Sequence, residues 1–390
     1  MELALCAVLL VAALLIAWTL LVRLNLLTAT QFFCPAPAPS LQIALASDAV
    51  DLHSKLRIAD LHTDAMIWRK DLNRRSRLGH FDFPRMRDGN GALQLFLSVT
   101  EIPRRTEGDD IDDYSDRLTL LGIVDQWPIG AVLDQTKRAL YYGHKLREFC
   151  AKSKGGVRFI ETASQLHRLL DDRITNPSLR GALLGLESSD GTKYALDNVK
   201  RLFVAGYRTC SLVHLTDSPF AASASGISKG RLTPLGRDAV MVMNEVGMII
   251  DLAHAAPRVI EDVLGQAQRV PFISHTGAKG IINDAKNMPD ELLRAVVDRG
   301  GVIGLCFVRD YVGGDGLNDI LRSLDYLIKV VGPKGVALGS GFDSFPTPIA
   351  VDQFAYLTQA LLSAGHDHAT IGAIMGENVI RFLLRELPQQ

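Results

Sequence analysis

Ile58-Ala-Asp-Leu-His-Thr-Asp64 begins with β-favouring residues and ends in a His-x-Asp pair, which predicts a strand with a polar carboxyl end. Residues two apart in a strand point to the same face, so His62 and Asp64 would project together. An imidazole and a carboxylate that converge on one point can bind a divalent metal ion. Such tripeptides are common, and a polar strand end is the alternative. The importance of this pair therefore depends on what ends the other strands.

Seven further short apolar runs follow, most of them separated by segments with helical periodicity. The eight expected strands begin near residues 56, 91, 182, 209, 248, 270, 301 and 335, and the expected helices cover 131–152, 193–204, 235–246, 258–267, 291–299 and 317–330. Continuous apolar runs suit parallel strands that are buried on both faces. Eight of them with crossover helices predict an α/β fold, a (β/α)8 barrel of the TIM type. An open doubly wound sheet is the alternative, but no Gly-x-Gly-x-x-Gly follows the first strand.

Composition narrows the class of protein. The chain has 390 residues, of which 47% are hydrophobic and 22% charged, and its formal net charge is -1. This balance argues against a nucleic-acid binder, which usually carries a basic excess. The five cysteines include no Cys-x-x-Cys pair, so a disulfide scaffold is not expected. The acidic stretch 101–130 predicts an irregular excursion over the surface.

The N-terminus carries an uncharged apolar run, Leu3–Val22, which is long enough to span a bilayer. We therefore expect a single N-terminal transmembrane helix within residues 1–25. A signal peptide is the alternative, but no basic segment precedes the run and no Ala-x-Ala site follows it. Arg23 after the run favours a cytoplasmic catalytic domain, with an extracytoplasmic one as the alternative. The Pro- and Ala-rich residues 26–45 predict an extended linker, and residues 46–390 the barrel domain.

Polar residues of the same few types end five of the expected strands. They are His62, Asp64, Glu187, His214, His254 and His275. In a barrel the carboxyl ends of the strands form one mouth, where active sites are built. Each histidine alone is more often structural, but the shared position predicts a metal site.

Two divalent ions would fit this set, with a central Glu187 as the bridge because a carboxylate has two oxygens. Imidazole-rich ligation favours zinc, with manganese and iron as alternatives. Two ions would share a hydroxide and polarise a carbonyl, which is the chemistry of amide or ester hydrolysis. His214, the remaining imidazole, would stabilise the oxyanion of a tetrahedral intermediate.

The order and spacing of these motifs resemble the membrane (renal-type) dipeptidase family, a zinc peptidase branch of the amidohydrolase barrels. The resemblance extends from about residue 56 to 384 and rests on Asp60-x-His62-x-Asp64, Gly185-x-Glu187, Leu212-x-His214, Asp251-Leu-Ala-His254, Ser274-His275, Asn287-x-Pro289-Asp290 and Gly376-x-Asn378-x-x-Arg381-Phe382.

That resemblance implies specific roles. His62 and Asp64 would bind one zinc ion, His254 and His275 the other, and Glu187 would bridge them. His214 would contact the substrate. It also implies cleavage of dipeptides, tolerance of a D-residue at their C-terminal position, and a homodimer.

Two positions depart from the family pattern. Lys286 stands where the family places an arginine that holds the substrate carboxylate. A lysine offers a point charge in place of the two parallel hydrogen bonds of a guanidinium group, so binding of the substrate carboxylate should be weaker and less selective. The family's Gly-x-Asp-Phe-Asp-Gly is Ser340-Gly-Phe-Asp-Ser344 here, so Gly341 replaces the first aspartate. Asp343 would take over the catalytic role of that aspartate only if the last strand is shifted. Without a carboxylate in this role, proton transfer to the leaving amine would slow by roughly 10²–10⁴-fold.

Three hypotheses follow, in order of preference. The first is a membrane-anchored, two-zinc dipeptidase. The second is a metal-binding relative of weak or no activity that serves a pathway as an accessory protein. The third is hydrolysis of another small amide, ester or lactam, with Lys286 and Gly341 as the altered specificity positions.

Overall fold

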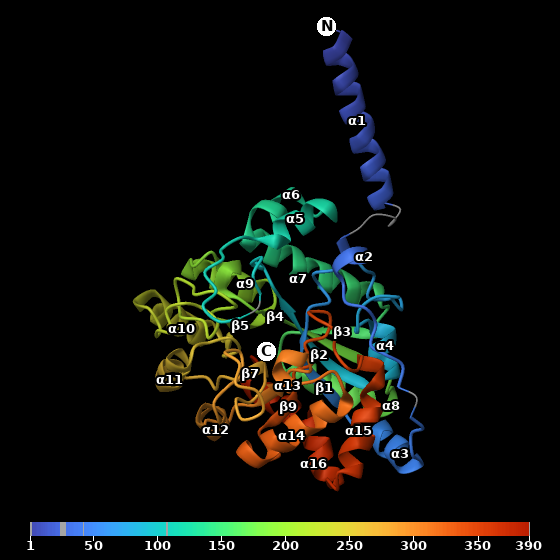
Figure 1. The fold of residues 1–390 in the computed structure, drawn as a ribbon. Coiled ribbons are helices and arrows are strands. Elements are labelled where there is room, and N and C mark those ends of the chain that lie inside the picture. Colours follow the sequence, from blue (N-terminus) through green and yellow to red (C-terminus); the bar gives the residue numbers. More distant parts are fainter. Residues whose placement is uncertain (1, 24–28, 42, 107, 390) are drawn as a thin grey trace.

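The computed structural model describes residues 2–23, 29–41, 43–106 and 108–389 (Figure 1). Its sheet consists of parallel strands with buried apolar side chains. The strands are β1 (Ile58–Thr63), β2 (Gly91–Ser98), β3 (Val157–Ile160), β4 (Arg180–Leu186), β5 (Tyr207–Ser211), β6 (Ile249–Asp251), β7 (Ile273–Thr276), β8 (Ile303–Leu305) and β9 (Val336–Leu338).

Eight of these strands form a nearly closed parallel barrel in the order β6-β5-β4-β2-β1-β9-β8-β7. The end strands β6 and β7 approach through an isolated parallel bridge between Asp251 and Phe272. Leu252 N donates a hydrogen bond to Phe272 O at 2.8 Å beside this bridge. The predicted α/β barrel of the TIM type is therefore confirmed, and its eight predicted strands correspond to these eight.

The ninth strand, β3, was not predicted. It pairs with the first half of β4, outside the barrel path, while β5 pairs with the second half of β4. Arg158 interrupts its short apolar run, and the middle of the strand is only half-buried. A four-residue strand with a central arginine lacks the continuous apolar pattern on which the prediction relied.

Helices cover the outside of the barrel in Figure 1. The α-helices of the described residues, α1 included, are α1 (Glu2–Arg23), α2 (Ala29–Phe33), α3 (Ser47–Lys55), α4 (Phe83–Asp88), α5 (Arg117–Val124), α6 (Ile129–Leu133), α7 (Gln135–Lys152), α8 (Ala163–Thr175), α9 (Leu196–Val204), α10 (Pro234–Val246), α11 (Pro257–Gln266), α12 (Asp290–Asp298), α13 (Arg309–Val312), α14 (Leu317–Val331), α15 (Phe354–Ser363), α16 (His368–Gly372) and α17 (Asn378–Glu386), and all but α1 lie around the barrel. Local signals explain their limits: in α10, Thr233 caps the first turn by accepting from Gly236 N, and Gly247 ends the helix at φ +88°. The stretch 101–130, predicted to be irregular, contains α5 and the start of α6.

The N-terminal apolar run forms α1, which points away from the barrel in Figure 1. Among the described residues, no helix meets the length and hydropathy that a membrane crossing requires. The predicted transmembrane helix is therefore not confirmed. Residues 24–28, where the predicted anchor meets the predicted linker, lie outside the described residues.

The predicted linker is partly helical and is docked on the barrel domain. Ala29 N, at the start of α2, donates to Asp125 Oδ1 at 2.7 Å. Arg69 N donates to Thr30 Oγ1 at 2.7 Å, and Gly79 N to Pro35 O at 2.8 Å. Ala29, Thr30 and Pro35 are buried, so the folded unit includes residues that precede the predicted boundary at 46.

Candidate metal centre

The barrel brings all six predicted strand-end residues to its carboxyl-terminal mouth. His62 and His275 are the last residues but one of β1 and β7, and Asp64 and Glu187 directly follow β1 and β4. His214 and His254 lie three residues beyond the ends of β5 and β6. A strand end fixes the direction in which a side chain leaves the sheet, so residues far apart in sequence converge here.

Glu187 lies at the centre of the cluster, and it is buried with 2% of its surface exposed. Its Oε2 is 3.0 Å from Nε2 of His62. Its Oε1 is 3.3 Å from Nε2 of His254, 3.5 Å from Nε2 of His275 and 3.4 Å from Nε2 of His214. The two oxygens of one carboxylate therefore serve different imidazoles, as a bridging ligand does.

The imidazoles also contact one another. Nε2 of His254 and Nε2 of His275 are 2.9 Å apart, and the ring centroids of His62 and His275 are 4.0 Å apart. Two nitrogens at this distance form a hydrogen bond only if one of them carries a proton. The alternative way to satisfy both lone pairs is a shared neighbouring cation.

The buried carboxylates of Asp64 and Glu187 also require a cation nearby. Burial and the charge of Glu187 hold the pKa of Asp64 well above its ordinary value. Burial would also raise the pKa of Glu187, but the charges and hydrogen bonds of the surrounding imidazoles outweigh it and hold this pKa well below the usual range. Oδ1 of Asp64 has no hydrogen-bond partner among the described residues. Two buried carboxylates side by side are stable only with a compensating positive charge.

These residues fit divalent metal ions. The ligand atoms of His62, Glu187 and His275 lie within 4.8 Å of one another, and so do those of Glu187, His214 and His254. Nitrogen and carboxylate donors of this kind suit zinc and related first-row metals. The two groups share Glu187, but they pair the histidines differently from the family resemblance, and distance alone does not separate His214 from the ligands.

Neighbouring polar groups orient the cluster, and sequence reasoning did not assign them. Ser274 Oγ lies 2.9 Å from Nδ1 of His275, which leaves Nε2 of that ring to face Glu187. Ser274 N in turn donates to Asp251 Oδ1 at 2.9 Å. Such contacts fix the tautomer and direction of a metal-binding imidazole. Asp251 and Ser274 belong to the motifs that carry the family resemblance. Their place beside His254 and His275 in the sequence was therefore the signal for an orienting role.

Lys286 lies beside this cluster, across the ring of Tyr311. Its Nζ is 5.8 Å from the Tyr311 ring centroid, which is itself 6.3 Å from the His275 ring. Nζ of Lys286 donates to Oδ2 of Asp310 at 2.9 Å, and 10% of the lysine side chain is exposed against 47% of the aspartate. Lys286, which was predicted to bind the substrate carboxylate, is therefore paired with the carboxylate of Asp310.

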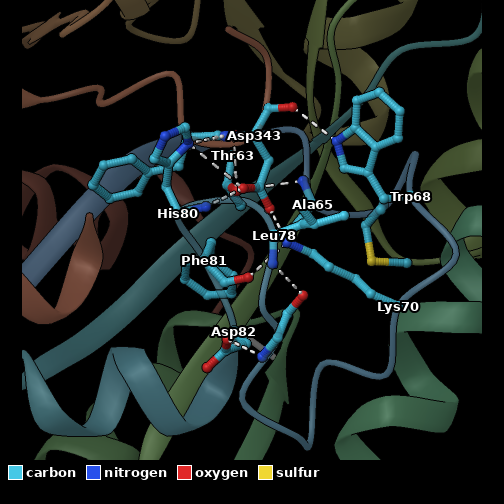
Figure 2. Close-up of polar contacts among 12 residues, drawn as sticks. Thr63, Ala65, Trp68, Lys70, Leu78, His80, Phe81, Asp82 and Asp343 are labelled. Atoms are coloured by element: carbon cyan, nitrogen blue, oxygen red, sulfur yellow. Dashed lines mark hydrogen bonds and ion pairs between the residues drawn. The ribbon is translucent and has the colours of Figure 1, made fainter. Parts of the chain in front are cut away.

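Asp343, predicted as a catalytic residue, has both carboxylate oxygens bound to residues outside the Glu187 cluster. Figure 2 shows its carboxylate between Lys70 and the backbone of His80. Oδ2 pairs with Nζ of Lys70, and Oδ1 accepts from His80 N at 2.5 Å. The catalytic role of Asp343 stays a prediction. Both partners lie in the polar loop after β1, and neither was assigned from sequence.

Gly341 occupies the position of the missing aspartate, and its backbone is left-handed with φ +72°. A Cβ added there would lie 2.9 Å from Cys306 Sγ and 3.2 Å from Val308 Cγ2. Ser344 Oγ would lie 3.5 Å away, so a side chain at this position would be crowded by three neighbours.

Comparisons with known proteins agree with this architecture. An uncharacterized dipeptidase of Schizosaccharomyces pombe is 25% identical over 354 aligned residues, covering 83% of this chain and 79% of the relative. A Klebsiella pneumoniae protein from the 5′ region of pqqA is 26% identical over 254 residues, covering 61% of this chain and 92% of the relative.

Solved structures share the fold. A Rhodobacter sphaeroides metallopeptidase, liganded with a phosphinate mimic of L-Ala-D-Ala, matches with a TM-score of 0.69 at 20% identity over 85% of this chain and 99% of that one. The probable dipeptidase PvdM of Pseudomonas aeruginosa matches with a TM-score of 0.71 at 16% identity over 88% and 98%.

The family model of membrane dipeptidases, peptidase family M19, matches residues 46–387. This match covers the whole barrel, from α3 to the last turn of α17. The predicted family is therefore confirmed: the chain belongs to the membrane dipeptidases, and it is a metallo-dipeptidase-type hydrolase.

Proposed function

We propose that this protein hydrolyses the peptide bond of dipeptides with two zinc ions bridged by Glu187. The observation that carries the proposal is the division of the Glu187 oxygens, Oε2 toward His62 at 3.0 Å and Oε1 toward His254 at 3.3 Å. His62 and Asp64 would hold one ion, and His254 and His275 the other. When bound, the ions supply an acidic shared water and a polarised scissile carbonyl.

The chain's own residues would do the rest. His214, whose pKa burial and His254 lower to about 4, is a neutral imidazole at pH 7. In that form one ring nitrogen carries a proton and can donate a hydrogen bond to a developing oxyanion. Lys286 would attract the substrate carboxylate once Asp310 yields its place, with Tyr311 forming the wall between cation and metal centre.

A second candidate rests on Gly341. With no carboxylate at that position and Asp343 paired to Lys70, the leaving amine has no acid from the last strand. General acid catalysis contributes roughly 10²–10⁴ in rate, so dipeptide hydrolysis would be slow. The alternative is then a small amide, ester or lactam with a better leaving group, or an accessory role without turnover.

The test is hydrolysis of a panel of L-L and L-D dipeptides, dipeptide amides and lactams by the full chain loaded with zinc. We expect turnover of dipeptides that chelation abolishes and that the Glu187→Gln variant lacks. Glu377→Gln, at a partly exposed ion pair with Arg57, is the matched control. Zinc-loaded wild type without dipeptide turnover, but with lactam or ester turnover, would favour the second candidate.

We also propose that α1 holds the enzyme at a membrane, with the barrel on the cytoplasmic side, and that the enzyme is a homodimer. Exposed apolar side chains on α1 support attachment, among them Val8, Leu10 and Leu14 at 64%, 62% and 61% exposure. The family resemblance supports the dimer. Fractionation of cells that express the chain with and without residues 2–23 tests attachment, and light scattering of the detergent-purified protein tests the dimer.

A further inference from the structure

A buried ion pair lies behind the candidate metal centre. The side chains of Lys70 and Asp343 are 5% and 0% exposed. Lys70 Nζ also donates to Phe81 O at 2.9 Å, and Asp343 Oδ1 accepts from His80 N, so both charged groups are satisfied only within this cluster (Figure 2). Removing one partner of such a pair leaves a buried charge without compensation, which displaces the groups around it.

The turn that contains Asp343 also holds the end of β1. Asp64 N donates to Phe342 O at 2.8 Å, and Thr63 Oγ1 donates to the same oxygen at 3.2 Å. The next carbonyl, that of Asp343, accepts from Trp68 Nε1 at 2.8 Å. Two adjacent residues of the turn therefore hold both the backbone of Asp64 and the loop that follows it.

This turn is conformationally costly. Asp343 has φ +69°, a left-handed conformation that is uncommon for non-glycine residues. Lys70 and His80 N hold this residue through its carboxylate.

We propose that Lys70 is a positioning residue for the metal ligand Asp64, and that it acts through its ion pair with Asp343. The inference rests on the two-ion centre of the proposed function. Asp343 is then retained in this chain to hold the turn under Asp64, and it does not handle the substrate proton. Losing Lys70 weakens the ion bound by Asp64 and His62 and leaves the ion bound by His254 and His275.

The experiment measures zinc ions per chain and the affinity of each ion, by competition with a chromophoric chelator, in the full-length protein. The variants are Lys70→Met, Asp343→Asn and the double variant, and circular dichroism checks their fold. Lys193→Met is the matched control, because Lys193 pairs with Asp134 at the surface, where its side chain is 51% exposed. Changing a residue behind a metal ligand costs about 10–100-fold in affinity.

We expect wild type and Lys193→Met to bind two ions. Lys70→Met and Asp343→Asn should each weaken one ion by about 10–100-fold and leave the other unchanged. The double variant should recover most of the loss, because the asparagine that replaces Asp343 can still accept from His80 N and no charge is left unpaired. A purely structural role for Lys70 predicts instead that both ions weaken equally.

Several outcomes would overturn the inference. One is unchanged affinity for both ions in folded Lys70→Met, or in Asp343→Asn where Lys70→Met does not fold. Equal weakening of both ions is another, and so is a double variant that binds no better than the single ones. A folded wild type that binds fewer than two ions would refute the two-ion centre itself, and this inference with it.

Discussion

Asp310 forms an ion pair with Lys286. We propose that the amine of Lys286 binds the carboxylate of a dipeptide, so the two carboxylates compete for it. The pair is half exposed on the Asp310 side, so its strength is about 0–1 kcal/mol. We expect Asp310→Asn to lower KM for dipeptides by up to about fivefold with little change in kcat, since the substrate no longer competes with a like charge. Steady-state kinetics on dipeptides and on their C-terminal amides measure this difference.

The control for this prediction is Asp315→Asn, at a strongly exposed pair with Arg309. That variant should leave both substrates unaffected. If Asp310→Asn changes KM equally for dipeptides and amides, the substrate carboxylate does not bind at Lys286.

A side chain at Gly341 would strain the backbone and would also crowd its neighbours. We expect Gly341→Asp to destabilise the fold by about 1–3 kcal/mol and to restore no activity, since the new side chain is strained at φ +72° and meets Cys306. Urea unfolding of the variant measures the loss.

Gly365 provides the matched control, with φ +89° and no atom within 4 Å of an added Cβ. Gly365→Asp introduces the backbone strain alone, so the difference between the two variants isolates the clash with Cys306. A Gly341→Asp protein that is as stable as Gly365→Asp and gains dipeptidase activity would show that this position still accepts an acid.

The position of the candidate metal-binding residues at one mouth could be predicted because each is fixed by its own strand. His62, Glu187 and His275 needed only a strand, its direction and its end. The partners of Asp343 could not be predicted this way, because Lys70 lies 273 residues away in an irregular loop. Sequence patterns report periodic elements, and contacts between loops carry no period.

At the scale of elements, α3 is joined to α15 by a buried histidine. Nδ1 of His53 lies 2.9 Å from Thr358 Oγ1, and burial lowers the pKa of His53 to about 4. An unfolded histidine has a pKa near 6.5, so between pH 6.5 and 4 the unfolded chain binds a proton that the folded chain does not. We therefore expect this histidine to cost stability as pH falls through that window, by up to about 3 kcal/mol at pH 4.

The measurement is urea unfolding of wild type and His53→Leu at several pH values between 4 and 7.5. The variant should lose less stability on acidification than wild type does, and His167→Leu, at an exposed histidine, should follow wild type. Parallel pH profiles for wild type and His53→Leu would mean that His53 does not titrate between these limits.

Strand limits show where element prediction succeeds and where it stops. The run 248–254 was predicted as one strand, but β6 ends at Asp251 and His254 adopts φ +63° in the following turn. The apolar pattern continues past the strand because these turn residues are buried at the mouth. Burial was therefore predicted correctly, and the change from strand to turn was not, since both bury the same residue types.

For the whole molecule, the cluster at the mouth couples metal binding to stability. We expect zinc to raise Tm and chelation to lower it, because the bound ions compensate two buried carboxylates. Zinc at about 100 times its Kd would add about 2.7 kcal/mol per site to the free energy of unfolding. Calorimetry with and without zinc measures the shift.

Glu187→Gln should lose most of this shift, and Glu377→Gln should keep it. A wild-type Tm that zinc does not move would contradict a metal site built into the fold.

The barrel itself was predictable because eight buried runs with crossover helices admit few topologies. The docking of residues 29–35 was not predictable, since this segment is short and its hydrogen bonds reach residues of distant loops. Prediction from sequence succeeded where burial repeats along the chain and failed where one end of the chain folds back on it.

The docking of residues 29–35 determines where the chain can be shortened for purification. Cys34 is buried close enough to Lys70 and Asp343 for their charges to act on its thiol, and Pro35 O receives Gly79 N. Trimming the chain to begin near residue 45, the obvious way to obtain it without the apolar helix, would bring water to the loop that carries Lys70. A low specific activity in such a shortened enzyme would then be an artefact of the cut, and cleavage ahead of Ala29 is the safer choice.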